Sequence, residues 1–245
     1  PTEVVGYYDG GSPGASKVVR VSNVDPRQGA PISLDFGAGA TPVSYPVTAP
    51  AGVPVLVSAH VRNQSDGRYL HLWSLRDQLA YSTMPSSLLR AGDLIRVGIT
   101  ATRPGATEES FLYLGAPGPA SLQFGPAFTP TAPARTAAPG VRAAFSVSAS
   151  ADTLPQVSYQ LSASTRAGSA LAWQSVAISQ RWFADAATTA YELPDFSGLP
   201  GWSNAMAMDA SVPLKWSVTR QEQSDKSYQA GLLVRTSMVS GELAN

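Results

Sequence analysis

The sequence contains no cysteine, and charged side chains are scarce. The 245 residues include 17 Lys and Arg and 17 Asp and Glu, so 14% of the chain is charged and the formal net charge is zero. An ordinary soluble domain has roughly 25% charged residues. Without cysteine the chain has no disulfide framework and no thiolate site for metal or redox chemistry. Without a basic excess, direct binding to nucleic acid is not expected.

Long apolar runs are also missing. A membrane-spanning helix needs about 20 consecutive apolar residues, and no such run occurs, so no membrane span is expected. The chain starts at Pro1 with neither an initiator methionine nor a signal peptide, from which we expect a processed or trimmed start. Hydrophobic residues make up 44% of the chain, which is enough to bury a sizeable core.

Short runs of β-branched and aromatic residues recur along the chain, separated by glycine, proline, aspartate and asparagine. The predicted strands of the first half are Val4–Tyr8, Lys17–Val24, Ile32–Phe36, Val43–Val47, Val53–Arg62, Arg68–Leu75, Leu94–Thr102 and Ser110–Leu114. Those of the second half are Val141–Ala149, Val157–Ala163, Leu171–Phe183, Val212–Thr219 and Tyr228–Val239. Helix is expected only at Leu75–Ala80 and Ser86–Arg90.

The pattern predicts an all-β fold with two β-sandwich or barrel-like domains, of jelly-roll or Ig-like type, and very little helix. Residues 126–140 are rich in proline and alanine and have no periodic apolar face. Proline fixes φ and lacks an N–H donor, so this stretch is unsuited to a central sheet. We therefore expect domains at 1–125 and 141–245 with a linker at 126–140. The alternative is a long crossover within one sandwich.

The two histidines of the chain, His60 and His71, flank the turn Asn63–Gly67. A hairpin across this turn would bring both onto neighbouring strands, where paired imidazoles could bind a metal ion or transfer a proton. A zinc site needs at least three protein ligands, and the pattern marks no third one. We therefore favour structural or surface histidines and expect no metal and no cofactor. Asn63-Gln64-Ser65 is also a glycosylation sequon in a turn that is expected to be exposed.

No arrangement typical of catalysis is found. The chain lacks the G-x-S-x-G elbow of a serine hydrolase, and Glu108 and Glu109, the one adjacent acidic pair, would point to opposite faces of a strand. Asp185, Glu192 and Asp195 crowd one loop and could bind calcium, but no EF-hand-like spacing exists, so we favour solvated loop acids. We expect that the protein is not an enzyme.

Aromatic residues in a loop with two prolines and two glycines give the best candidate contact site. Phe196 and Trp202 could form an exposed platform for a partner protein or a sugar ring, or they could fold back over the end of the core. Met206 and Met208 follow directly. We interpret them as part of an apolar contact with a partner rather than as copper ligands.

The composition favours a non-catalytic structural or surface protein that acts through protein–protein assembly. A low surface charge is typical of surfaces that are covered by other protein. Such proteins form virion shells or spikes, cell-surface layers and adhesive components, so an extracellular, cell-surface or virion-surface location is expected. The expected partners are other copies of the chain or another surface protein. The alternative is a carbohydrate-binding β-sandwich module that uses Phe196 and Trp202.

Overall fold

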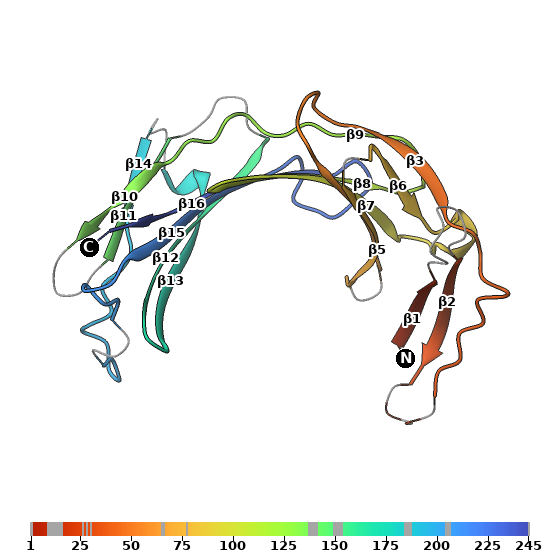
Figure 1. Ribbon diagram of the computed structural model, residues 1–245, viewed down its shortest axis with the longest axis horizontal. Helices are drawn as coiled ribbons and strands as arrows, with labels where there is room; N and C mark the ends of the chain where they lie inside the picture. Colours follow the sequence, from red (N-terminus) through yellow and green to blue (C-terminus); the bar gives the residue numbers. More distant parts are fainter. Residues whose placement is uncertain are drawn as a thin grey trace. The chain divides into compact units, whose positions relative to one another are not determined.

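The computed structural model shows an all-β protein, as predicted, with 57% strand and 3% helix. It describes residues 2–8, 17–25, 27, 29, 31–64, 67–76, 78–136, 142–148, 154–183, 188–203 and 207–244 (Figure 1). Within these residues no helix is both long and apolar enough to cross a membrane.

Among the described residues, the elements with defined bounds are strands and short 3-10 helices. They are β1 (Thr2–Tyr8), β2 (Lys17–Val24), β3 (Val43–Thr48), β4 (Leu56–Arg62), β5 (Tyr69–Arg76), β6 (Ala80–Thr83), η2 (Ser86–Leu88), β7 (Leu94–Arg103), β8 (Ala106–Leu114), β9 (Ala120–Ser121), β10 (Thr131–Thr136), β11 (Arg142–Ser148), β12 (Gln156–Ala167), β13 (Ala170–Ser179), η3 (Gln180–Phe183), β14 (Thr188–Glu192), β15 (Leu214–Gln223) and β16 (Leu233–Leu243).

The chain forms two compact units, and each unit consists of three chain segments. Unit 1 comprises Pro1–Ala101, Phe111–Gln123 and Ser227–Leu233. Unit 2 comprises Thr102–Ser110, Phe124–Lys226 and Val234–Asn245. Strands β7 and β8 therefore contribute residues to both units. The predicted domain limits 1–125 and 141–245, and the jelly-roll or Ig-like type, stay predictions.

Unit 1 is built around β4, which pairs antiparallel with β5 on one side and β7 on the other. A second small sheet has the order β6-β3-β9, and β6 lies against β4 and β5. The alternation predicted for Val53–Arg62 is present, because Val57, Ala59 and Val61 are completely buried. Their neighbours His60 and Arg62 are only partly buried, on the opposite face of the strand.

A buried ion pair ties the β1–β2 hairpin to the rest of unit 1. The Arg20 guanidinium on β2 lies 2.5 Å from the Asp93 carboxylate, and the two side chains are 3% and 1% exposed. Arg20 also donates to the Leu88 carbonyl at 2.9 Å, while Asp93 accepts the backbone amides of Arg90 and Gln64 at 3.0 and 3.4 Å. The guanidinium and the carboxylate thus each have further hydrogen-bond partners, as buried charged groups require.

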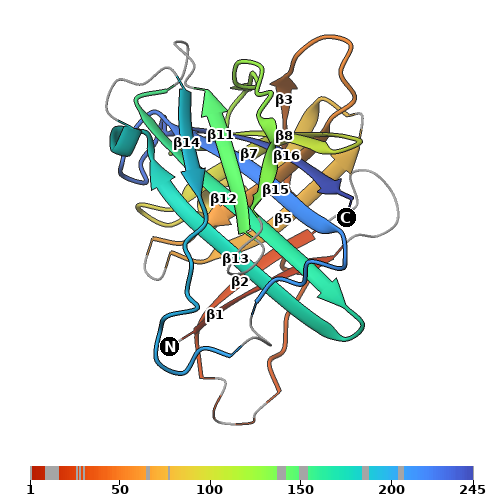
Figure 2. The same ribbon diagram turned by 90° about the vertical axis from the view of Figure 1, so that its left-hand side faces the viewer.

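Unit 2 has two layers that enclose one apolar core. Strands β13-β12-β15-β16 form a continuous antiparallel sheet, and β10-β11-β14 form the second layer. Figure 2 shows β11 and β14 lying across β12 and β15. The core side chains include Phe145, Tyr159, Leu161, Leu193, Leu214, Trp216 and Val218. A second buried ion pair, between Arg220 and Glu222 at 2.8 Å, lies on β15 with both side chains 1% exposed.

The predicted linker is wrong for Thr131–Thr136, because these residues form strand β10. This strand pairs antiparallel with β11 and is the edge strand of its sheet. The register is interrupted between Thr131 and Ala134, at the position of Pro133. Proline is compatible with an edge strand or a bulge, where its missing N–H breaks no ladder bond. The proline content therefore excludes a central strand and permits an edge strand.

Two further expectations in unit 1 are wrong. Residues 32–36 form no strand, although Leu34 and Phe36 alternate as strand residues do. Their side chains pack instead on Gly6 of β1, where an added Cβ would clash with Leu34 Cδ1 and Phe36 Cζ. The described residues of the range 75–80 form no helix, because Arg76 ends β5 and Ala80 begins β6. In the range Ser86–Arg90, only Ser86–Leu88 is helical.

Candidate functional site

The two histidines lie side by side on the outer face of unit 1. Where the turn is predicted, the Asn63 amide donates to the Arg68 carbonyl and the Gly67 amide donates to the Asn63 carbonyl. His60 on β4 faces His71 on β5, and His60 Nε2 lies 2.9 Å from His71 Nδ1. One of these two nitrogens donates the hydrogen and the other accepts it. Asn63 itself is only 5% exposed, so the expected exposure of the sequon is wrong at its asparagine.

The histidine pair has few of the features of a metal site. In the part of the chain that the structure describes, no group of three or more His, Cys, Asp or Glu could hold a metal ion. Burial, the charge of Arg96 and the His71 ring lower the pKa of His60 to about 4, so His60 is neutral at pH 7. The buried His60 Nδ1 has no hydrogen-bond partner. A metal-binding role for His60 and His71 therefore stays a prediction, and no third ligand for such a site is seen among the described residues.

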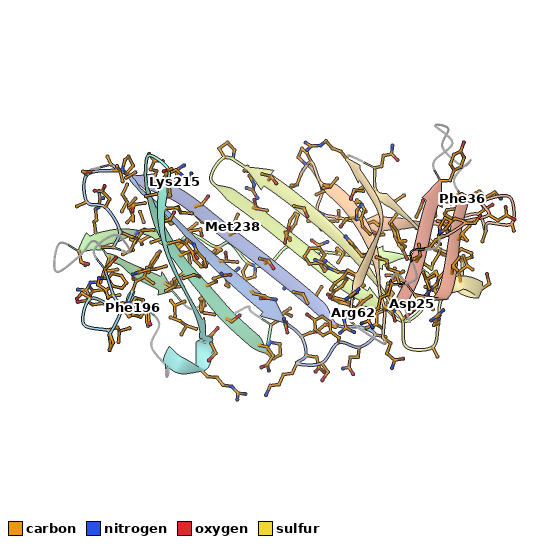
Figure 3. The ribbon with its side chains drawn as sticks, turned by 90° about the horizontal axis from the view of Figure 1, so that it is seen from below. Asp25, Phe36, Arg62, Phe196, Lys215 and Met238 are labelled. Carbon is orange, nitrogen blue, oxygen red and sulfur yellow. The ribbon has the colours of Figure 1, made fainter. Side chains whose placement is uncertain are left out.

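Arginine and tyrosine side chains lie next to the histidine pair, and the ring centroids of Tyr69 and His60 are 6.4 Å apart. We call Arg62, Arg96, Tyr69, Tyr113 and Tyr228 the arginine–tyrosine cluster; Arg62 is labelled in Figure 3. The hydroxyls of Tyr69 and Tyr113 are 2.8 Å apart. The Arg62 guanidinium lies 4.4 Å from the ring centroid of Tyr228, and the Arg96 guanidinium lies 5.3 Å from the ring centroid of Tyr69. The Tyr113 and Tyr228 rings meet edge to face at 5.5 Å. All five residues belong to unit 1.

The loop that contains Phe196 and Trp202 is ordered by its own hydrogen bonds. The Asp195 carboxylate accepts the Ser197 amide at 2.8 Å, and the Trp202 amide donates to the Leu199 carbonyl at 3.1 Å. The two rings are 6.2 Å apart and tilted by 42°, and both residues are partly buried. Phe196 is labelled in Figure 3. The rings therefore lie together, and their role as a contact for a partner or a glycan stays a prediction.

The remaining candidates do not converge on one site. Met208 is 4% exposed and belongs to the core of unit 2, so it cannot contact a partner in this conformation. Met206 and Asp185 lie outside the described residues. Glu192 pairs with Arg142 at 2.8 Å, while the Asp195 carboxylate is held by Ser197. These contacts give Glu192 and Asp195 separate partners instead of a common calcium ion.

The outer face of the unit 2 sheet is broad and mostly uncharged. One row across β13, β12, β15 and β16 consists of Ser175, Ser162, Ser217 and Ser240, each opposite the next in register. Ser162 and Ser175 are hydrogen-bonded at 2.9 Å. Lys215 and Met238, labelled in Figure 3, belong to the same face. Neutral hydroxyl and amide groups dominate this surface, so electrostatic repulsion of a second protein would be weak.

Two large apolar side chains stand exposed at the border of this face. Leu171 and Trp173 of β13 are 56% and 61% exposed. They share one face of the strand because they are two residues apart. The inward-facing residues Ala172, Val176 and Ile178 pack on the core. The strand thus has an apolar inner face and an outer face that carries an exposed indole ring.

Strand β13 is an edge strand, and its register with β12 has no interruption from the pair Ala167–Ala170 to the pair Ser158–Ser179. A two-residue turn joins the strands, and Gly168 adopts the positive φ of 60° that such a turn requires. In this hairpin type the closing pair exchanges both hydrogen bonds, and bonded pairs alternate with non-bonded ones. The amides of Leu171, Trp173, Ser175, Ala177 and Ser179 therefore point away from β12, toward the free edge.

Sequence reasoning missed both the exposed edge and the arginine–tyrosine cluster. The alternation of Leu171 and Trp173 with Ala172 and Gln174 was the available signal for the edge, but it does not say which face is covered. Tyr113 and Tyr228 are far from Tyr69 along the chain, and only the fold brings them together. No protein-family model matches the chain, and comparison with curated proteins finds no significant relative.

Proposed function

We propose that this protein is a non-catalytic structural protein that assembles with further copies of itself through the free edge of β13. The observation that carries the proposal is the chemistry of this edge. The sequence of β13, ALAWQSVAIS, contains no charged residue and no proline, and its pairing has no bulge. An edge of this length leaves a row of N–H and C=O groups ready to pair with another strand.

The other edge strands that the structure describes all carry a feature that disfavours pairing. Strand β5 has a bulge and ends in Arg76, and β10 has an irregular register at Pro133. Strand β14 is five residues long and ends in Glu192, while β6 and β9 have four and two residues. Strands β1 and β2 form a two-stranded sheet; β1 contains Glu3 and has an irregular register between Thr2 and Val4, and β2 contains Lys17 and Arg20. Natural proteins protect their edges with short strands, charges, prolines and bulges. Because β13 lacks all of these, its edge is suited to a partner strand.

The partner that fits this edge is a second copy of β13 in antiparallel orientation. Two identical strands can pair about a two-fold axis, which gives the closed symmetry that is commonest among homo-oligomers. No like charges would face each other, because β13 has none and the chain as a whole is neutral. The pairing would also cover Leu171 and Trp173, which are otherwise exposed to water.

The test is sedimentation velocity over a range of micromolar concentrations. The wild-type protein should sediment as a dimer or larger species, and Ala177→Lys should shift it toward the monomer by placing a charge on the exposed edge. Ala51→Lys adds the same charge on an exposed turn of unit 1 and should leave the assembly unchanged. A wild-type protein that stays monomeric at 100 µM, a concentration of order ~10⁻⁴ M, would overturn the proposal.

A second proposal is the carbohydrate-binding module with Phe196 and Trp202. The adjacency of the two rings at 6.2 Å favours it. Trp202→Ala should then abolish binding to a glycan array without a change in sedimentation. Either function is proposed to operate outside the cell or on a cell or virion surface, where assembly proteins and lectin-like modules act.

A further inference from the structure

Two partly buried arginines of unit 1, Arg62 and Arg96, have no carboxylate partner within the described chain. Several arginines form ion pairs with Asp or Glu, namely Arg20, Arg103, Arg142 and Arg220. By contrast, Arg62 and Arg96 form no ion pair and no hydrogen bond within the described chain, and the buried Arg96 Nε has no acceptor. Both residues are partly buried. A partly buried cation without a partner is costly, and an anion that supplies the missing acceptors would be stabilised.

The two guanidinium groups are held by aromatic rings rather than by acceptors. Arg96 lies 3.5 Å from the Phe111 ring centroid and 5.3 Å from that of Tyr69, and Arg62 lies 4.4 Å from that of Tyr228. A guanidinium that lies over a ring uses its flat face for this contact. Its N–H donors lie in the plane of the group and stay available for an oxyanion.

Tyrosine hydroxyls add neutral donors to the same place. Burial raises the pKa values of Tyr113 and Tyr228, so both hydroxyls stay protonated at neutral pH. The Tyr69 hydroxyl is hydrogen-bonded to the hydroxyls of both Tyr113 and Tyr228. These two bonds use two of the three hydroxyl hydrogens, so one hydrogen of the three tyrosines is left to donate to a ligand. Tyr69 and Tyr228 are 39% and 51% exposed, so their rings are open to a ligand from solution.

We infer that the arginine–tyrosine cluster is a binding site for an acidic saccharide, a sugar that carries a sulfate or carboxylate group. The oxyanion would accept hydrogen bonds from the edges of Arg62 and Arg96. The exposed rings of Tyr69 and Tyr228 would contact the apolar face of the sugar, and their hydroxyls would bond its oxygens. The neighbouring His60 and His71 supply further ring nitrogens at the border of the site.

This site is separate from the proposed assembly function. Its residues belong to unit 1, whereas β13 belongs to unit 2. A variant of the cluster should therefore leave sedimentation unchanged, and a variant of the β13 edge should leave saccharide binding unchanged. The two proposals can fail independently.

The experiment is an NMR titration of the full chain with four probes: N-acetylglucosamine 6-sulfate, glucuronic acid, neutral N-acetylglucosamine and sodium sulfate. At least one acidic sugar should shift the resonances of the cluster, and the tighter of the two identifies the preferred acidic group. Neutral N-acetylglucosamine should bind at least about tenfold more weakly, since it lacks the charge-assisted hydrogen bonds. Sodium sulfate should compete with the sulfated sugar for the same donors.

Variants locate the site. Arg62→Gln and Arg96→Gln should each lower the affinity by about tenfold or more, because each removes one charged donor group. Arg166→Gln makes the same change at an exposed arginine of β12 and should have no effect. Tyr228→Ala, at a half-exposed position, tests the ring contact if Arg96→Gln lowers the folded fraction. The inference is overturned if neither acidic sugar binds, if the neutral sugar binds equally well, or if Arg166→Gln weakens binding as much as the cluster variants do.

Discussion

Replacing Arg20 by methionine should strongly destabilise unit 1. Arg20→Met keeps most of the side-chain volume but leaves the Asp93 carboxylate, which is 1% exposed, without its cationic partner. Removing one partner of a buried ion pair typically costs about 3–5 kcal/mol. Asp93 keeps the backbone amides of Arg90 and Gln64 as donors, so the lower end, about 3 kcal/mol, is expected.

The assay is thermal and urea unfolding of the full chain at pH 7. For a protein of this size, 1 kcal/mol shifts the midpoint by roughly 2–4 °C. The melting transition of unit 1 should therefore fall by about 10 °C. Arg166→Met, at an exposed position, is the matched control and should change stability by less than about 0.5 kcal/mol.

The pH dependence gives a second readout. Burial alone would raise the pKa of Asp93, but the bonds from Arg20 and from the Arg90 and Gln64 amides outweigh it and lower the pKa below its ordinary value of 3.8. The ionised carboxylate therefore contributes its full stabilisation above pH 3.8, and the contribution is lost as the pH falls through the lower folded value. This acid-dependent loss should shrink in Arg20→Met.

A double-mutant cycle decides whether the two charges act as a pair. Arg20→Met combined with Asp93→Leu removes both charges and should be less destabilising than the sum of the two single changes. The reasoning is refuted if the double variant loses the full sum, or if Arg20→Met is no more destabilising than Arg166→Met.

Three further predictions follow from the same structure. Trp173 is 61% exposed, which leaves roughly 120 Å² of its side chain to be covered in an assembly, worth about 3 kcal/mol. Trp173→Ala should therefore weaken self-association by about 100-fold in a sedimentation equilibrium series, whereas Leu79→Ala, 53% exposed in unit 1, should not. Glu222→Gln breaks the buried pair on β15 and should cost about 3 kcal/mol in unfolding experiments, while the exposed Glu242→Gln should cost almost nothing. Burial, Arg96 and His71 lower the pKa of His60 from 6.5 to about 4. The folded state therefore favours the neutral ring, and the free energy of unfolding should decrease as the pH falls from 6.5 to 4. NMR titration of the His60 ring checks this, and a midpoint near 6.5 would contradict it.

The sequence predicts most strands of this fold because their alternation is strict. Val55, Val57, Ala59 and Val61 are buried as expected, and the turn after Arg62 brings His60 next to His71. Patterns of this kind depend on near neighbours in the chain, so local reasoning is sufficient. The same reasoning fails for Leu34 and Phe36, whose alternation is satisfied by packing on Gly6 without a hydrogen-bonded partner strand.

Sites that depend on distant residues could not be predicted in this way. Arg96 and Tyr228 are more than a hundred residues apart, and their common neighbour Tyr69 connects them only after folding. The position of β13 at an edge likewise depends on which strands pair, and composition does not determine this. Met208 illustrates the reverse error, because a loop position suggested a surface contact and the side chain is buried in the core.

The central proposal, assembly through the edge of β13, is tested most directly by residue-resolved hydrogen exchange at low and high protein concentration. The amides of Leu171, Trp173, Ser175 and Ala177 point to the free edge and should exchange rapidly in the monomer. If β13 pairs with a second copy, alternate backbone groups become hydrogen-bonded, and protection of these four amides should rise together with the assembled fraction. Rapid exchange of all four in fully assembled protein would contradict the proposal.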